Sequence, residues 1–373
     1  MAMKRSSLSR REFLRLAAVG MGTLAGSRLL SACSQIPASA TTIPTLAVSA
    51  TATTAPTALP TASAVLLRRP LADIMKFFPV VPSKVIQTHH SGVWSDKTLV
   101  AGALRQMLDA SITRLTGLND VREAWAALFK PNERIAIKVN AFSNSRIWTH
   151  VPLVLEVTNS LQEAGIPASQ ITIFDFTTPE LSTAGFTVNE DNAGVRCKGM
   201  DANYSAKPTK VMNNQIKLAN ILTECDALIN IPVLKSHMLS GVTFAMKNHY
   251  GSLYLPDYLH GDSMKSIAAL NSLPEIKDRT RLIIGDALTA NLRYANSYPY
   301  WQADWTGDSI FMSYDPVAHD TIGLQLLTRE LEKIGDNPAA AIGMATPWLQ
   351  YAVELGLGTN DPAAMEVIEQ TVA

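Results

Sequence analysis

The chain has few cysteines and lacks the short motifs of several large enzyme classes. Its 373 residues include three cysteines, too few to ligate an iron–sulfur cluster or to build a disulfide scaffold. No G-x-x-x-x-G-K-S/T, G-x-G-x-x-G, G-x-S-x-G or H-E-x-x-H pattern occurs. These absences argue against a P-loop, a dinucleotide fingerprint, a nucleophile elbow and a zincin helix. Cys197 and Cys225 are either two core thiols or one disulfide, and the sequence leaves that open.

Charge is also scarce, at 17% of residues, and positive charge is concentrated at the N-terminus. Residues 1–32 carry six basic residues and one acid, which leaves 26 basic and 31 acidic residues and a formal charge of −5 in the remainder. Nucleic-acid binding needs a surplus of Lys and Arg, so we expect no nucleic-acid partner. The hydrophobic fraction of 47% excludes a wholly disordered chain.

The N-terminal residues resemble an export signal with a lipid attachment site. Ser9–Arg15 resembles the twin-arginine motif, and the apolar stretch 16–30 that follows is short for a membrane span. Leu30–Cys33 resembles a lipobox, in which the cysteine is diacylated and becomes the new N-terminus. We therefore expect a signal peptide over 1–32, the twin-arginine machinery as a partner, and an extracytoplasmic lipoprotein held on a bilayer through Cys33.

A linker is expected between this anchor and the folded domain. Residues 33–64 are rich in Ala, Thr, Ser and Pro, and 34–64 contain no charge. Such a segment cannot bury enough apolar surface to fold, so it is interpreted as a disordered tether. The folded domain is then expected over 65–373.

Within this domain, short β-branched runs alternate with helical periods. Strands are predicted at 84–88, 134–139, 171–175, 227–231, 281–285 and 309–313. Helices are predicted at 98–116, 121–129, 152–164, 218–224, 263–273 and 316–334, with two more near 347–355 and 362–371. The alternation predicts an α/β fold whose mostly parallel sheet has helices on both faces, Rossmann-like but without a dinucleotide fingerprint.

Polar side chains follow several of the predicted strands. They are Lys138 and Asn140, Asp175, Lys235 and His237, Asp286, and Asp315. Because the carboxyl ends of parallel strands share one edge, we expect these groups to converge there. Simpler interpretations remain for some of them: Asp315 before a proline suits a helix N-cap, and Asp175 and Asp286 suit loop caps.

The segment 235–251 is the densest in chemistry-bearing side chains. It holds two lysines and two histidines, together with Asn248 next to Lys247. Such groups suit an anionic small molecule, and a metal held by His and Asp is the alternative occupant. We expect His237 and Lys235 to be catalytic, and Lys138, Asn140, Lys247 and Asn248 to bind the ligand. The candidate metal ligands are Asp175, Asp286 and His260, and the cofactor is otherwise unknown. The pair His89-His90 is either structural or a further contributor.

At these residues the chain resembles the DUF362 family, a group named for its unknown function. The resemblance spans roughly residues 130–330 and is carried by Lys138–Asn140, Asp175, Leu234–His237, Ala245–Gly251, His260, Gly285-Asp286 and Asp315–Asp320. Family members often carry a ferredoxin-like cluster module, for which this chain lacks the cysteines. The resemblance implies a shared site and supplies no reaction.

Three functions fit this pattern. The first is an enzyme in which the lysines bind an anion and His237 transfers a proton. The second is a lipid-anchored protein that binds a solute or cofactor without chemistry, and the third is an accessory redox protein that works beside a cluster-bearing partner.

Overall fold

The computed structural model describes residues 82–191, 193–295 and 297–373. The expected signal peptide, the linker and Cys33 lie outside these residues. None of the helices in the described ranges has the length and apolarity needed to cross a bilayer.

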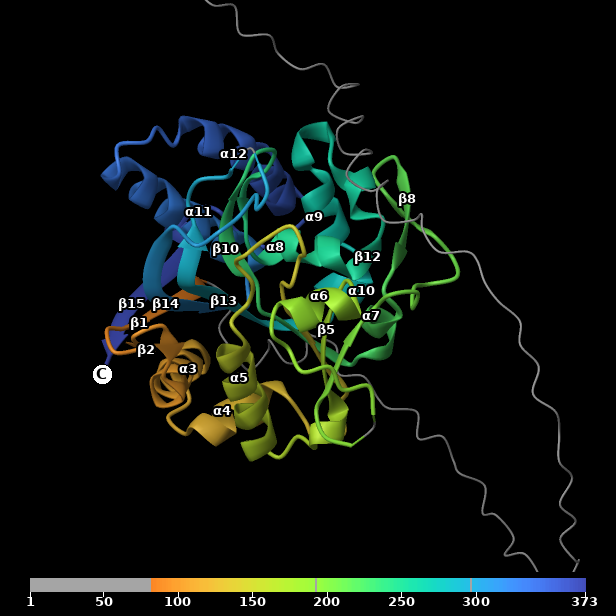
Figure 1. Cartoon of the computed structure of the whole chain (residues 1–373), viewed down its shortest axis with the longest axis vertical. Helices are drawn as coiled ribbons and strands as arrows, with labels where there is room; N and C mark the ends of the chain where they lie inside the picture. Colours follow the sequence, from red (N-terminus) through yellow and green to blue (C-terminus); the bar gives the residue numbers. More distant parts are fainter. Residues whose placement is uncertain (1–81, 192, 296) are drawn as a thin grey trace, which may run out of the picture. The chain divides into compact units, whose positions relative to one another are not determined.

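A ten-stranded sheet forms the centre of the domain (Figure 1). Its main path runs in the order β15-β1-β14-β13-β9-β4-β5-β6, and every strand on it except β14 points the same way. The strands of this path are β1 (Ser83–His90), β4 (Ile135–Lys138), β5 (Ile171–Asp175), β6 (Arg196–Gly199), β9 (Ala227–Asn230), β13 (Thr280–Asn291), β14 (Trp305–Ser313) and β15 (Met365–Val372). The predicted mostly parallel α/β fold is confirmed.

Strand β13 is long enough to pair with two strands in succession. Its first residues pair with β9, and its later residues pair in parallel with β10 (Val233–His237), which also forms a hairpin with β11 (Gly241–Thr243). No strand is predicted at 233–237 from the sequence. Because β10 follows β9 along the same partner strand, it carries Lys235 and His237 beyond the carboxyl end of β9.

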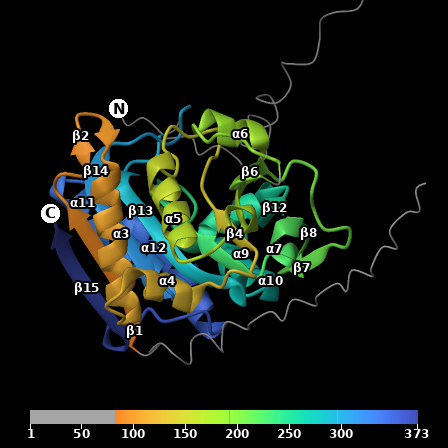
Figure 2. The same ribbon diagram turned by 90° about the horizontal axis from the view of Figure 1, so that it is seen from below.

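Helices cover both faces of the sheet, and each face has its own core (Figure 2). Neighbouring residues of one strand point to opposite sides, as Leu228 and Ile229 do, because successive side chains alternate. On the Ile229 side lie α3 (Ala101–Thr116), α4 (Val121–Leu128) and α5 (Val151–Glu163). The Leu228 side is covered by α7 (Asn220–Glu224), α8 (Ala245–Asn248), α9 (Ser266–Asn271), α10 (Pro274–Lys277), α11 (Pro316–Lys333) and α12 (Ala339–Glu354).

The remaining elements are short. They are α6 (Thr178–Thr183), the hairpin of β2 (Trp94–Ser95) and β3 (Thr98–Leu99), and a three-stranded sheet of β7 (Thr209–Val211), β8 (Asn214–Leu218) and β12 (Leu253–Tyr254). Single 3-10 turns occupy Ala168–Gln170, His249–Ser252, Pro256–Leu259, Asp262–Met264 and Pro362–Ala364.

The C-terminal segment corrects one prediction. The helix expected at 362–371 is instead the edge strand β15, which pairs in parallel with the whole of β1. Residues 365–372 alternate between half-buried and exposed side chains, the period of a strand, and β1 offers an unpaired edge. The expected helix at 347–355 is the second half of α12.

The two described cysteines are free and buried. Cys197 belongs to the core beneath α3 to α5, whereas Cys225 belongs to the core on the other face. The disulfide alternative therefore does not apply to this pair.

Candidate functional site

Four strands end at the same edge of the sheet, and each brings a polar side chain. Lys138 is the last residue of β4, Asp175 the last of β5 and Asn230 the last of β9, while β10 carries Lys235 and His237. The register places Lys138 beside both Phe174 of β5 and Asn230 of β9. The register therefore brings Lys138 and Asn230 together at this edge, and the hydrogen bond from Lys235 to Asn140 Oδ1 joins Lys235 to them.

Lys138 and Asp175 form a fully enclosed ion pair. The Lys138 Nζ donates to Asp175 Oδ1 at 2.6 Å, to the Val139 carbonyl at 2.6 Å and to Asn248 Oδ1 at 3.4 Å. These three bonds use all three donors of the ammonium group. Burial lowers the pKa of Lys138, and the charge of Asp175 opposes that shift. The other carboxylate oxygen, Asp175 Oδ2, accepts from the Ala141 backbone N–H at 2.5 Å.

Three asparagine side chains extend this pair into a network. Asn248 Oδ1 accepts from Asn140 Nδ2 at 3.2 Å as well as from Lys138, and Asn248 Nδ2 donates to Asn230 Oδ1 at 2.7 Å. The Asn230 amide in turn donates to the Ala245 carbonyl at 2.8 Å. The network joins β4, β9 and α8, so it fixes the relative positions of Lys138, Asn140 and Asn248.

Lys235 is held by neutral acceptors. Its Nζ donates to Asn140 Oδ1 at 2.6 Å, and lies 3.2 Å from the Ile147 carbonyl and 3.5 Å from Ser145 Oγ. The Trp301 ring centroid is 5.6 Å away. Within the described ranges, Lys235 forms no ion pair with a carboxylate. Burial lowers its pKa to about 7, helped by the nearby charge of Lys138 and opposed by that of Asp175.

Lys247 is held in a similar way. Its Nζ lies 3.1 Å from His260 Nε2 and 3.9 Å from the centroid of the Tyr250 ring. It too forms no ion pair with a carboxylate in the part of the chain that the structure describes. Burial lowers the pKa of Lys247 to about 7, with Asp257 raising it and Lys235 lowering it further.

Asp320 holds the short helix that carries Lys247 and Asn248. Its two carboxylate oxygens accept from the backbone N–H groups of Ala245 at 2.6 Å and Met246 at 3.0 Å. Asp320 is fully buried, and its own helix α11 packs against α8. Sequence reasoning noted Asp320 only as part of the family resemblance, because its role depends on contact between elements far apart in the chain.

The hydrogen bonds of His237 define which ring nitrogen carries its proton. His237 Nδ1 accepts from the backbone N–H groups of Leu239 at 3.0 Å and Ser240 at 3.3 Å. In the neutral ring, the proton is therefore on Nε2. Burial lowers the pKa of His237 well below its usual value, and the charges of Lys247, His260 and Lys235 lower it further. His237 is thus neutral near pH 7 and presents a hydrogen-bond donor.

Aromatic rings from distant parts of the chain surround His237. The His237 ring stacks on His260 with centroids 5.9 Å apart, and Trp301 and Tyr294 lie 5.7 and 6.3 Å away. Trp301 and Tyr294 lie between β13 and β14, and Trp301 Nε1 donates to the Ser236 carbonyl at 2.7 Å. No spacing motif links this connection to segment 235–251, so only the fold brings the two together.

The three candidate metal ligands do not gather at one point. Asp175 pairs with Lys138, His260 lies against Lys247, and Asp286 accepts from the backbone N–H and the Nδ1 of His150, both at 2.8 Å. No group of three or more His, Cys, Asp or Glu side chains suited to a metal forms among the residues with described positions. The expected metal set is corrected accordingly, because each member already has a different partner.

His150 was missed by the sequence analysis. Burial lowers its pKa, but the charge of Asp286 and the hydrogen bond to it raise the pKa by more, so the net shift is upward. The residue precedes α5 in an otherwise ordinary loop, and no local pattern marks it.

Two of the simpler interpretations are confirmed. Asp315 caps α11, because its Oδ1 accepts from the N–H groups of Val317 and Ala318, both at 2.8 Å. His90 is structural: its Nε2 lies 2.9 Å from Gln106 Oε1, and its Nδ1 accepts from the Gly92 N–H.

The fold and this edge define an α/β protein with a buried lysine and amide site at the carboxyl ends of its parallel strands. A family model described as "Domain of unknown function (DUF362)" matches residues 135–325, and the chain belongs to this family. No curated protein matches the sequence. The matched range includes the residues of the lysine site, from Lys138 of β4 to Asp320 of α11.

Two solved structures show distant similarity. The lactate racemase apoprotein from Thermoanaerobacterium thermosaccharolyticum is 13% identical with a TM-score of 0.34, over 65% of this chain and 57% of that one. A protein from Thermotoga maritima is 9% identical with a TM-score of 0.32, over 70% of this chain and 60% of that one. The chain thus spans less than two thirds of the length of either structure.

Proposed function

We propose that the protein is an enzyme that carries out acid–base chemistry on a small anionic molecule at this edge of the sheet. The observation that carries the proposal is the environment of Lys235 and Lys247. Both ammonium groups are buried among neutral acceptors and aromatic faces, with pKa values lowered to about 7. A bound anion would supply the negative charge that these lysines lack, and a group that titrates near pH 7 suits proton transfer.

The neighbouring groups have distinct roles in this proposal. Lys247 binds the anion, because its ammonium has one hydrogen-bond acceptor at 3.1 Å and retains donors for a ligand. Lys235 transfers the proton, and the Nε2–H of His237 donates to the developing charge as a neutral imidazole. Lys138, with all its donors used, positions Asn140 and Asn248, which orient the ligand.

The test starts from proton exchange, since the substrate is not identified. The full chain is incubated in deuterium oxide with a panel of small carboxylates and phosphate monoesters, and exchange at carbon is followed by proton NMR. We expect Lys247→Met to lose affinity, Lys235→Met to lose exchange with affinity retained, and the exposed control Lys210→Met to behave as the wild type.

His237→Ala separates catalysis from simple binding. Retained affinity with lost exchange supports the enzyme, whereas loss of affinity alone supports a binding protein that uses the same residues. Tight binding of a panel member by the wild type without exchange or turnover would also favour the binding protein and would contradict the enzyme.

We infer further that the protein is exported through the twin-arginine route and anchored by lipid at Cys33. The support is the order and spacing of the motif at Ser9–Arg15 and the lipobox at Leu30–Cys33. Cells fed labelled palmitate should label the wild type in the membrane fraction and not the Cys33→Ser variant. Replacement of Arg10 and Arg11 by Lys should retain the protein inside the cell.

A further inference from the structure

A second concentration of positive charge lies along one face of β4, β5 and β6. Arg134 precedes β4, and Arg196 and Lys198 belong to the edge strand β6. All three line a cavity of about 150 Å³ that is separate from the lysine site. By strand rise, Arg134 lies about 13 Å along β4 from Lys138.

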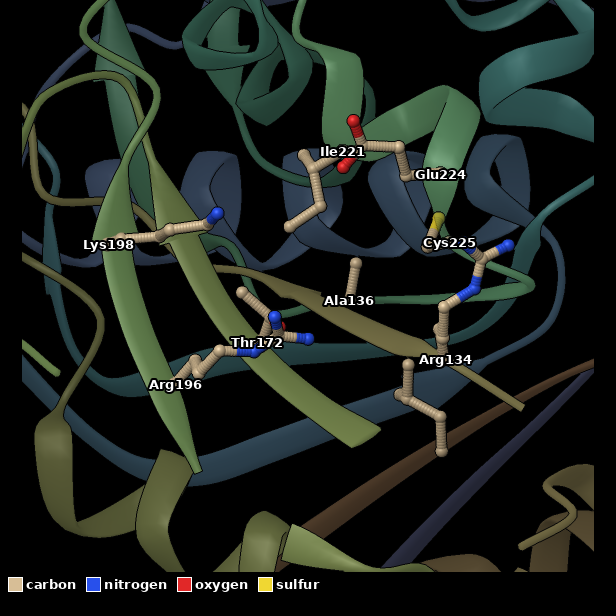
Figure 3. A pocket seen from close by; sticks show the side chains of 9 residues that line it. Arg134, Ala136, Thr172, Arg196, Lys198, Ile221, Glu224 and Cys225 are labelled. Atoms are coloured by element: carbon tan, nitrogen blue, oxygen red, sulfur yellow. The ribbon is translucent and has the colours of Figure 1, made fainter. Parts of the chain in front are cut away.

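Small side chains on neighbouring strands create this cavity. The register aligns Ala136 with Thr172 and Thr172 with Arg196, so these three face the same side in one row across β4, β5 and β6. Ala136 and Thr172 are too short to fill the space below α7, which contributes Ile221 and Glu224 with the adjoining Cys225. In Figure 3, Arg196 and Lys198 lie on one side of the cavity and Arg134 and Cys225 on the other, with Ala136 between them.

The cations of the cavity are only partly neutralised. Arg134 pairs with Asp226 through bonds of 3.1 and 3.2 Å. Among the residues whose positions are described, Lys198 has no ion pair and the buried Nε of Arg196 has no hydrogen-bond partner. The other recorded bond of Arg196 is a long one, 3.5 Å from Nη2 to the Ser169 carbonyl. A buried guanidinium N–H without an acceptor calls for one, and the exposed carboxylate of Glu224 is the only acid in the cavity lining.

We propose that this cavity binds a phosphate group, either as inorganic phosphate or as a small phosphate monoester. Guanidinium N–H groups match phosphate oxygens in geometry, and Lys198 adds a mobile point charge. The ligand would occupy the space above Ala136 and Thr172 and accept from Arg196 Nε. The proposal is independent of the reaction at Lys235, since the two sites share no residue.

Calorimetric titration of the full chain with inorganic phosphate and with glycerol phosphate tests the proposal. We expect binding to the wild type, and a loss of affinity of about tenfold or more in the double variant Arg196→Met, Lys198→Met. Lys210→Met, an exposed lysine on β7, is the matched control and should bind as the wild type does. Stronger binding of one of the two probes identifies which form of phosphate the cavity prefers.

Cysteine alkylation locates the binding independently. Cys225 lines the cavity, whereas Cys197 faces the other core, so phosphate should slow alkylation of Cys225 and leave Cys197 unchanged when peptides are resolved by mass spectrometry. Equal phosphate affinity in the wild type and the folded double variant overturns the proposal. Binding that is lost in Lys247→Met but kept in the double variant also overturns it, because the ligand would then occupy the lysine site. The proposal is also overturned if about 10 mM phosphate gives neither a heat of binding nor protection of Cys225 from alkylation.

Discussion

The two ends of the parallel strands differ in how many of their buried cations have a carboxylate partner: at the candidate end Lys138 pairs with Asp175, while Lys235 and Lys247 have no such partner among the described residues. At the start of β13, Arg281 donates to Glu133 Oε2 at 2.6 Å and to two backbone carbonyls, so its charge is matched by a carboxylate. At the other end, Lys235 and Lys247 face amide, carbonyl, hydroxyl, imidazole and aromatic groups. Removal of one member of a buried ion pair leaves the other charge uncompensated, while a charge surrounded by neutral groups stays available to a ligand. The two unpaired cations are lysines, whose pKa shifts readily on burial, whereas Arg281 stays charged beside its carboxylate.

Removal of the structural cation should have the largest effect on stability. Arg281→Met leaves Glu133 buried without its guanidinium partner, and we expect the free energy of unfolding to fall by about 3–5 kcal/mol. Urea unfolding followed by circular dichroism measures the change. The exposed pair of Arg293 and Asp336 supplies the control, since Arg293→Met should leave the midpoint unchanged. Equal losses in the two variants would remove the contrast between buried and exposed pairs.

The candidate lysines should act on stability in the opposite direction. In the folded protein the pKa of Lys235 is about 7, below its ordinary value of 10.5, so the unfolded chain binds more protons between these two pH values. The burial of Lys235 therefore lowers the free energy of unfolding most below pH 7, and this loss disappears as the pH rises towards 10.5. We expect Lys235→Met to be more stable than the wild type at pH 7, and the difference to shrink by on the order of 1 kcal/mol per pH unit.

Urea midpoints at pH 7, 8 and 9 test this expectation, with Lys210→Met as the exposed control. A difference that stays constant with pH would show that Lys235 is charged in the folded protein throughout this range. Lys235 would then be unsuited to proton transfer near neutral pH. The two strand ends would differ only in the hydrogen-bond partners of their cations.

Several strands of the sheet could be predicted from the sequence because they contain short apolar runs, whereas β6 contains none and was not predicted. Residues 171–175 form the strand that was predicted, and the ends of 135–138 and 227–230 differ from prediction by one residue. The strand at 365–372 was mistaken for a helix, because its formation depends on the edge that β1 offers and not on a local apolar pattern. Strand β10 was missed for a related reason: its pairing with β13 depends on the unusual length of that strand.

The candidate site was predictable to the extent that it lies at strand ends. Lys138, Asn140, Lys235 and Asn248 were singled out because each follows or lies near an apolar run, and the structure joins them by hydrogen bonds. Contacts between distant loops have no such signal. The contact of Trp301 with His237 and the pairing of His150 with Asp286 could be found only once the fold placed those loops together.

The ion pair at the candidate end can be strained without a change of charge. A Cβ at Gly251 would overlap Asp175 Oδ1 and lie 2.8 Å from Lys138 Nζ. Gly251→Ala should therefore push the pair apart and cost about 2 kcal/mol in unfolding free energy, with weaker ligand binding. At Gly261 a Cβ meets nothing within 4 Å, so Gly261→Ala is the matched control and should match the wild type. A Gly251→Ala protein with normal stability and binding would mean that the pair tolerates displacement, and that its geometry is not needed by the site.

The smallest stability change, with the most specific consequence, is expected at Asp320. Asp320→Asn keeps one acceptor for the α8 backbone and turns the other oxygen into a donor that faces an N–H group, at a cost of about 1 kcal/mol. Since α8 carries Lys247 and Asn248, the same change should weaken anion binding by more than the loss of stability alone explains.

Asp315→Asn is the control, because Asp315 caps α11 with two similar bonds and touches no site residue. Calorimetric titration with the anion that binds best to the wild type separates the two variants: both should unfold earlier in urea, and only Asp320→Asn should bind more weakly. Equal affinities would mean that the lysine at 247 finds its place without the Asp320 cap, and that the buried carboxylates at both ends of the strands serve the fold alone.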